Sequence, residues 1–186
     1  MIVIFEGPDR VGKSTQVELL KTQLTKINHL STHVLHYSYF KNLDKKYQKT
    51  FSIQLYRDMF NLIDYNHCNF ILDRSHIGEM VYAPLYRHYS GDYVLDLELE
   101  YKYLIRKVNL ITLINSDINI LKDKNDNNSL SNNDLIKIKD ETQSFINATN
   151  KSNIYNKIII DVNNLDVDAV YYKILEFLFN RETMKC

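Results

Sequence analysis

Long apolar runs, paired cysteines and an excess of either charge are all missing from this sequence. No apolar run approaches the ~20 residues that a bilayer-spanning helix needs, so we expect no membrane segment. Cys68 and Cys186 stand far apart, which argues against a disulfide framework and favours a reducing, cytoplasmic compartment. The 23 basic residues balance 23 acidic ones, so bulk electrostatics give no reason to expect a nucleic-acid partner.

Linkers are missing as well. The chain has no Pro-rich or Gly/Ser-rich stretch and no internal repeat, and 186 residues are few for two independent domains. We therefore expect residues 1–186 to form a single domain. Residues 1–6 are apolar up to Glu6 and carry no basic leader, so we interpret them as a buried strand rather than a signal peptide.

Strand and helix patterns alternate along the chain. Apolar or alternating segments that are typical of strands lie at residues 1–6, 32–37, 69–72, 108–114 and 157–161. Helical spacing of apolar residues lies between and after them, at about 13–27, 45–66, 77–89, 93–106 and 167–177. This order predicts an α/β fold with a five-stranded parallel sheet flanked by helices on both faces.

One polar stretch interrupts this alternation. Residues 123–129 are almost free of apolar side chains, and we expect a surface loop there, inside a lid-like segment at about 115–130. Ser131 and Asp134 have the spacing of a capping box. They predict the start of a further helix that continues through Ile146.

A phosphate-binding motif directly follows the first predicted strand. Residues 7–14 match the pattern G-x-x-x-x-G-K-[ST], and the motif lies between a strand and a helix, as this loop requires. Glycines let successive backbone N–H groups point at phosphate oxygens, and the helix start adds a positive dipole. The residues predicted to contact the triphosphate are Gly7, Pro8, Asp9, Arg10, Val11, Gly12, Lys13, Ser14 and Thr15.

Two residues of this motif have chemically defined roles. Lys13 reaches the β- and γ-phosphates and the hydroxyl of Ser14 binds Mg²⁺, so ATP and Mg²⁺ are the predicted cofactors. A lysine at a helix start is unfavourable unless an anion lies nearby, which supports the phosphate contact. A second charged pair, Asp73 and Arg74, closes the predicted strand at 69–72. In open α/β sheets, ligands bind outside such strand ends.

The longer string around the motif resembles the thymidylate kinases. Residues 5–16 read F-E-G-P-D-R-V-G-K-S-T-Q, where that family typically has F-E-G-x-D-x-x-G-K-S-T-Q. Asp73 and Arg74 lie where the family carries a D-R pair, and Tyr82 falls at its usual tyrosine position. The resemblance implies a P-loop kinase fold, a homodimer formed through helices, and phosphorylation of a deoxynucleoside monophosphate. It gives dTMP to dTDP, with ATP and Mg²⁺, as the first expectation.

The same resemblance implies roles for single residues. Asp9 would lie near the acceptor sugar or metal, Arg74 would bind the acceptor monophosphate, and Tyr82 would crowd the sugar 2′ position. Arg10 resembles the loop arginine of those members that carry none in the lid, and it would stabilise charge during phosphoryl transfer. Asp73 would bind Mg²⁺ through water, cap the next helix, or do both.

Alternatives remain open at this stage. Arg57 is the expected base contact from the helix at 45–66, but Ile53 stands where a base-stacking aromatic belongs, so the acceptor could carry a modified pyrimidine. The string Asp73-Arg74-Ser75 also resembles deoxynucleoside kinases, in which Asp73 would act as the base for a sugar hydroxyl. A hypothesis of another class is a regulatory module in which nucleotide binding orders residues 115–130.

Overall fold

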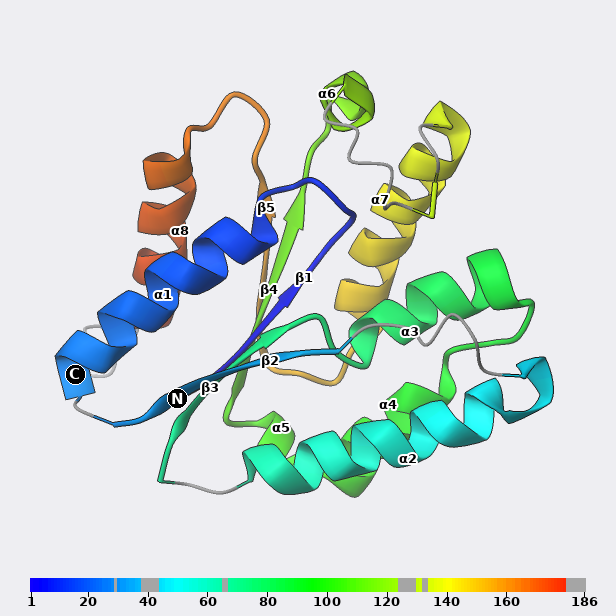
Figure 1. Cartoon of the computed structure of the whole chain (residues 1–186), viewed down its shortest axis with the longest axis horizontal. Helices are drawn as coiled ribbons and strands as arrows, with labels where there is room; N and C mark the ends of the chain where they lie inside the picture. The colour runs from blue at the N-terminus through cyan, green and yellow to red at the C-terminus, as the bar shows by residue number, and fades with distance from the viewer. Residues whose placement is uncertain (29, 38–43, 65–66, 124–129, 132–133, 180–186) are drawn as a thin grey trace.

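The strands of the protein form one parallel sheet. The computed structural model describes residues 1–28, 30–37, 44–64, 67–123, 130–131 and 134–179. Within these residues five strands lie in the order β2-β3-β1-β4-β5, all parallel (Figure 1). Their bounds are β1 (Ile2–Glu6), β2 (Thr32–His36), β3 (Asn69–Asp73), β4 (Val108–Ile114) and β5 (Asn156–Asp161).

Helices cover both faces of this sheet. Their bounds are α1 (Lys13–Asn28), α2 (Lys45–Ile63), α3 (Ile77–Tyr82), a π-helical turn η1 (Ala83–Arg87), α4 (Tyr93–Glu100), α5 (Lys102–Ile105), α6 (Ile118–Asp123), α7 (Leu135–Lys151) and α8 (Val167–Phe179). Helices α1 and α8 lie together on one face, and α2 lies with α4 and α5 on the other (Figure 1). The predicted α/β fold class is therefore confirmed.

The two faces of the sheet bury separate apolar cores because successive strand residues point to opposite sides. In β1, Ile2 and Ile4 pack with apolar residues of α2, α3, α4 and α5. Val3 and Phe5 pack instead with residues of α1 and α8. A central parallel strand is buried on both sides, which explains its unbroken apolar sequence.

Three helix predictions need correction. The helix predicted over 77–89 ends at Tyr82 and continues as the π-helical turn, where Pro84 has no N–H to donate to a normal helical hydrogen bond. The helix predicted over 93–106 divides at Tyr101 into α4 and α5. The helix expected to start at Ser131 is α7, which begins at Leu135. Asp134 is its N-cap and accepts from the amides of Ile136 and Lys137.

The lid-like segment at about 115–130 includes a helix. Its first half contains the helix α6, which local polarity did not predict, and the expected loop residues 124–129 lie outside the described part of the chain. Among the described helices, none has the length and apolar character needed to cross a bilayer. Cytoplasmic location and a homodimer stay predictions.

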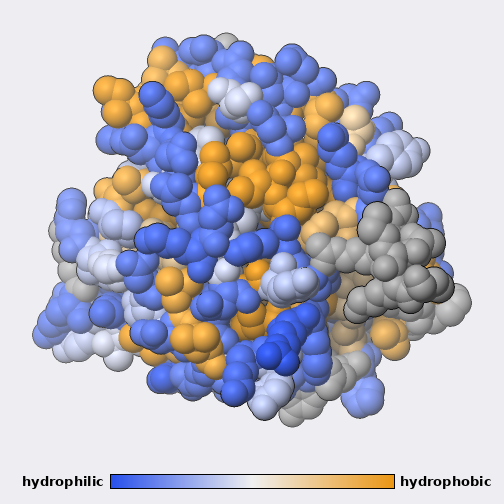
Figure 2. All heavy atoms as spheres, turned by 180° about the vertical axis from the view of Figure 1, so that it is seen from behind, coloured by the Kyte–Doolittle hydropathy of each residue, from blue (hydrophilic) through white to orange (hydrophobic). Residues whose placement is uncertain are grey.

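Apolar side chains gather near the middle of the molecule when it is seen from behind (Figure 2). The edge strand β5 contributes Ile158, Ile159 and Ile160 to a groove that Phe177 of α8 also lines. The phosphate-binding loop lies elsewhere, at the carboxyl end of the central strand β1. The apolar surface at β5 is therefore separate from the candidate active site.

Candidate active site

The loops after β1 and β3 meet at the carboxyl edge of the sheet. The two strands are neighbours, and their register places Phe5 beside Asp73. The backbone N–H of Arg74 donates to the carbonyl of Phe5 at 3.0 Å. From β1 the chain runs toward β2, at one edge of the sheet, and from β3 it runs toward β4, in the opposite direction. The two connections therefore diverge next to each other and leave a crevice between them.

The phosphate-binding loop needs glycine at both of its fixed glycine positions. Gly7 has φ 134°, and a Cβ atom there would lie 2.0 Å from the carbonyl oxygen of Leu113. Gly12 has φ 86°, in the region that residues with a Cβ atom rarely adopt. A substitution at Gly7 must displace backbone, so this position fixes how closely the loop packs on β4.

Lys13 folds back over the loop at the start of α1. Its Nζ donates to the carbonyl oxygens of Gly7 at 3.0 Å and Pro8 at 2.5 Å. The side chain is buried, and burial together with the nearby Arg74 lowers the pKa of Lys13 to about 7. A bound phosphate chain supplies the negative charge that favours the protonated lysine. The geometry thus suits the predicted triphosphate contact.

Ser14 and Asp73 come together across 59 residues of sequence. The Ser14 hydroxyl donates to Oδ2 of Asp73 at 3.1 Å, and Nδ1 of His36 lies 3.3 Å from the same oxygen. Oδ1 of Asp73 is buried and has no hydrogen-bond partner among the described residues. A hydroxyl beside a carboxylate with an oxygen to spare fits Mg²⁺, which keeps several waters and binds substrate phosphates.

Mg²⁺ bound at Ser14 and Asp73 would share its coordination with the nucleotide. In the part of the chain that the structure describes, no three His, Cys, Asp or Glu side chains are grouped as they would be to hold a metal by themselves. A site with few protein ligands completes its coordination with phosphate oxygens and water. Ser14 and Asp73 are therefore the residues that would hold the ion.

Arg74 turns its guanidinium back toward the phosphate-binding loop. One nitrogen pairs with the carboxylate of Asp9, while Nη1 donates to the hydroxyl of Tyr82 at 2.9 Å and to the carbonyl of Gly7 at 3.5 Å. The ring of Tyr82 lies beside the same guanidinium, 5.5 Å from centroid to Cζ. The structure therefore brings Asp9, Arg74 and Tyr82 together, and the roles that the resemblance implies for them stay predictions.

Arg10 and Arg57 lie in different surroundings. Nη1 of Arg10 donates to the carbonyl of Leu121 in α6 at 2.8 Å, so the loop arginine contacts the lid-like segment. Nη2 of Arg57 lies 3.0 Å from Glu100 of α4, and both side chains are more than 40% exposed. The described contacts of Arg57 include no other candidate site residue, and its role as a base contact stays a prediction.

Glu141 belongs to the site although the sequence gives no sign of it. The carboxylate lies on α7, accepts a hydrogen bond from the hydroxyl of Tyr86, and lines a small cavity with Asp9 and Arg10. Burial, with Asp9 nearby, raises the pKa of Glu141 above its usual value. Tyr86 is 55 residues away in sequence, so only the tertiary fold shows this contact.

A second cavity borders the other side of the phosphate-binding loop. It has a volume of about 200 Å³ and is lined by Gly12, Thr15 and Gln16 on one side. Asn115 after β4 and Leu165 after β5 line the other side. Its position next to the loop makes it the natural place for the base and sugar of a bound triphosphate.

Comparisons with known proteins agree with this architecture. No protein-family model and no curated protein matches the sequence. Among solved structures, YorR from Bacillus subtilis, in complex with phosphorylated GDP, matches with a TM-score of 0.67 at 20% identity over 98% of each chain. The thymidylate kinase of Candida albicans matches with a TM-score of 0.62 at 19% identity, over 97% of this chain and 92% of that one.

The thymidylate kinase of Ehrlichia chaffeensis matches with a TM-score of 0.60 at 17% identity, over 96% of this chain and 98% of that one. The chain has the fold of the thymidylate kinases. At these identities the likeness shows the thymidylate kinase fold alone. What the site does must therefore be argued from its own residues.

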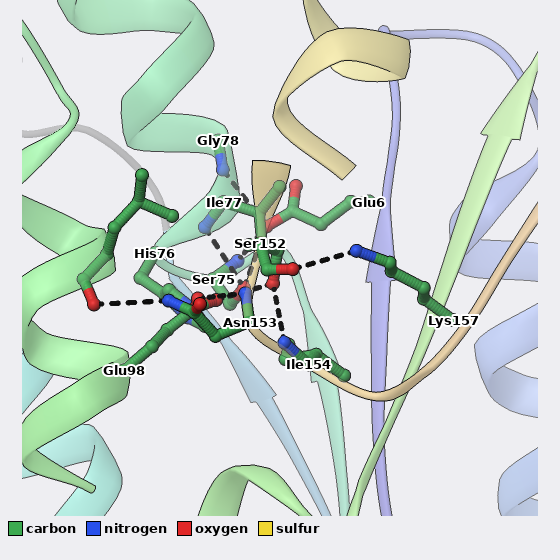
Figure 3. A network of polar contacts seen from close by, with 11 residues as sticks. Glu6, Ser75, His76, Ile77, Gly78, Glu98, Ser152, Asn153, Ile154 and Lys157 are labelled. Carbon is green, nitrogen blue, oxygen red and sulfur yellow. Dashed lines mark hydrogen bonds and ion pairs between the residues drawn. The ribbon is translucent and has the colours of Figure 1, made fainter. Parts of the chain in front are cut away.

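In this thymidylate kinase fold, a buried polar network supports the turn after Arg74 (Figure 3). Nε2 of His76 lies 2.9 Å from Oε1 of Glu98 in α4. The hydroxyl of Ser152 and the N–H of Asn153, which follow α7, donate to the same carboxylate, each at 2.6 Å. Burial alone would raise the pKa of Glu98, but the hydrogen bonds from His76 and Ser152 outweigh it and hold the pKa below its usual value.

This lowered pKa predicts how stability depends on acid. Because the folded pKa of Glu98 is depressed, its contribution is present above about pH 4.5 and is lost as the pH falls through the folded pKa. Glu98→Gln should lower the free energy of unfolding by about 1–3 kcal/mol at pH 7. The difference from the wild type should shrink below pH 4, as measured by urea unfolding.

Glu100→Gln is the matched control for this prediction. Glu100 lies on the same helix but is 47% exposed, so its replacement should change stability by less than about 0.5 kcal/mol at any pH. Equal effects of the two substitutions at pH 7 would show that the buried network does not stabilise this turn.

Proposed function

We propose that this protein transfers the γ-phosphoryl group of ATP, bound with Mg²⁺, to the phosphate of a nucleoside monophosphate. The observation that carries this proposal is the meeting of two cations at one loop. Lys13 and Arg74 both donate to the carbonyl of Gly7, from α1 and from the end of β3. A donor phosphate on Lys13 and an acceptor phosphate on Arg74 would be held next to each other.

The roles of the residues follow from their positions. Lys13 neutralises charge on the β- and γ-phosphates, and Arg74 holds the acceptor phosphate with its planar guanidinium. Ser14 and Asp73 hold Mg²⁺, which would neutralise charge on the bridging phosphates. The acceptor oxygen is already ionised, so the transfer requires no general base and no covalent protein intermediate.

We propose dTMP as the first acceptor to consider. The resemblance of residues 5–16 to the thymidylate kinases supports thymine as the base. Tyr82 supports a deoxyribose, because its hydroxyl binds Arg74 and its ring lies beside the same guanidinium, where the sugar of the acceptor would lie. A guanine nucleotide is a further candidate, since YorR was solved with phosphorylated GDP. A nucleoside acceptor is less favoured, because the guanidinium of Arg74 beside the phosphate-binding loop suits an acceptor phosphate that a nucleoside lacks.

The proposal is tested by ADP release from ATP and Mg²⁺ with dTMP, dUMP, dCMP, dGMP, GMP, dAMP and thymidine offered singly. Turnover that depends on a monophosphate supports the proposal and identifies the base. Turnover with thymidine alone would show a nucleoside kinase in place of the proposed nucleotide kinase. If none of the seven acceptors is used, a modified pyrimidine nucleotide is the next one to offer. Tight ATP binding without any turnover would favour the regulatory module.

Arg10→Ala should lower the rate of transfer more than it weakens ATP binding. A loop arginine stabilises charge that develops during transfer, and we expect kcat to fall about 100- to 1,000-fold while the Kd for ATP changes less than about threefold. Single-turnover kinetics and equilibrium titration of ATP measure the two effects separately. Equal losses in kcat and in ATP affinity would make Arg10 a ground-state ligand. The control is Arg106→Ala, which removes an exposed arginine and should change neither kcat nor the Kd for ATP.

A further inference from the structure

The carboxylate of Glu6 lies buried between the phosphate-binding loop and the turn that follows Arg74. Glu6 is the last residue of β1, immediately before Gly7, and its side chain is fully buried. Its Oε1 accepts from the N–H of Ser75 at 2.7 Å, the hydroxyl of Ser75 at 2.8 Å and the N–H of Gly78 at 3.2 Å (Figure 3). One oxygen therefore binds both ends of the turn at 75–78.

Arg74 needs such support because its backbone is unfavourable. Its φ of 74° lies in the left-handed region, which residues with a side chain rarely adopt. The N–H of Arg74 donates to the carbonyl of Phe5, and the N–H of the next residue, Ser75, donates to the carboxylate of Glu6. Two consecutive residues of β1 thus hold Arg74 in the conformation that turns its guanidinium toward Asp9.

We propose that Glu6 is a positioning residue for the phosphoryl acceptor. It contacts neither substrate; it holds Ser75 and Gly78 so that the guanidinium of Arg74 stays beside the phosphate-binding loop. This inference rests on the proposed function of Arg74 as the acceptor site. It assigns Glu6 an effect on acceptor use that is separate from ATP binding.

The structure also indicates how Glu6 acts. All of the described hydrogen bonds of the Glu6 carboxylate are accepted by Oε1. The other oxygen, Oε2, is buried and has no hydrogen-bond partner among the described residues. Burial raises the pKa of the Glu6 carboxyl above its usual value. A glutamine could present the same oxygen to the same donors, and an alanine could not.

The test compares Glu6→Ala and Glu6→Gln in steady-state and binding measurements. Glu6→Ala leaves three donors without their acceptor, and we expect the acceptor KM to rise about 10- to 100-fold while the Kd for ATP stays within about threefold. Glu6→Gln should keep the acceptor KM within about threefold of the wild type. A fall in kcat with an unchanged acceptor KM in Glu6→Ala, or equal defects in both variants, would overturn the proposal.

Ile174→Val controls for loss of stability alone. It removes one methylene from the apolar core on the opposite face of the sheet from Ile77, and we expect lower stability without a change in acceptor KM. If the wild type transfers phosphate to no acceptor, the proposed function fails first. Hydrogen exchange then tests the role of Glu6 without any acceptor. Glu6→Ala should speed exchange of the Ser75 and Gly78 amides about 100-fold, and unchanged protection would refute the proposal that Glu6 holds this turn.

Discussion

Replacing Lys13 by alanine should lower kcat by about 1,000-fold with any acceptor that the wild type uses. Lys13 would lie on the phosphate oxygens that change charge during transfer, and removing one such donor in a water-poor site costs about 100- to 1,000-fold or more. The variant also loses the positive charge that draws the triphosphate into the loop. Steady-state ADP release at saturating ATP measures the effect.

Two controls accompany this prediction. Lys21→Ala removes a lysine on the same helix that is exposed and paired with Glu18, and its activity should match the wild type. Loss of Lys13 should not unfold the protein, because its pKa of about 7 shows that the fold disfavours its charge. Thermal unfolding checks this, and near-normal turnover in a folded Lys13→Ala variant would refute the phosphate-loop mechanism.

Replacing Arg74 by alanine should chiefly impair use of the acceptor. We expect kcat/KM for the acceptor to fall about 100- to 1,000-fold, because a guanidinium that binds two phosphate oxygens is lost, while the Kd for ATP stays within about threefold. Arg74→Lys should recover only part of the loss, since an ammonium cannot bind in a planar, two-point manner. Initial rates at varied acceptor and fixed ATP give these values.

The control for Arg74 is Arg106→Ala, which removes an exposed arginine at the end of α5. It should leave both substrates unaffected. An Arg74→Ala variant with an unchanged acceptor KM, or with equal losses for ATP and acceptor, would move the acceptor site elsewhere in the crevice. Asp9, which pairs with Arg74, would then be the next residue to replace.

The sequence predicts the sheet well for a physical reason. Parallel strands are buried on both faces, so each one reads as a short apolar run closed by polar residues, as at β1 and β3. The phosphate-binding loop is equally readable, because its glycines and lysine lie within eight consecutive residues. Its position at a strand end next to Asp73 and Arg74 follows from the parallel topology.

Local breaks were harder to predict from the same information. Apolar spacing continues through 77–89, yet Pro84 cannot donate a backbone hydrogen bond and the helix changes to a π-helical turn. No helix was predicted at α6 either, since short helices depend on tertiary contacts such as the one between Arg10 and Leu121. Asp134 is the N-cap of α7, so the helix begins after Asp134 and not at Ser131.

The supporting side chains could not be predicted, because their partners are distant in sequence. Glu6 meets Ser75 across 69 residues, and Glu98 meets Ser152 across 54. Glutamate is seldom fully buried without partners, and only the fold shows which donors let these two be buried. The pairing of Arg57 with Glu100, which is 43 residues away on another helix, likewise has no sign in the sequence.

The most direct test of the central claim follows the phosphoryl group itself. ATP labelled at its γ-phosphate with ³²P is incubated with the protein, Mg²⁺ and each nucleoside monophosphate, and the products are separated. Our account predicts label in the β-phosphate of a nucleoside diphosphate, formed by the wild type and lost in Lys13→Ala and Arg74→Ala. Label found only in inorganic phosphate or on a nucleoside hydroxyl, or unchanged transfer in Arg74→Ala, would contradict it.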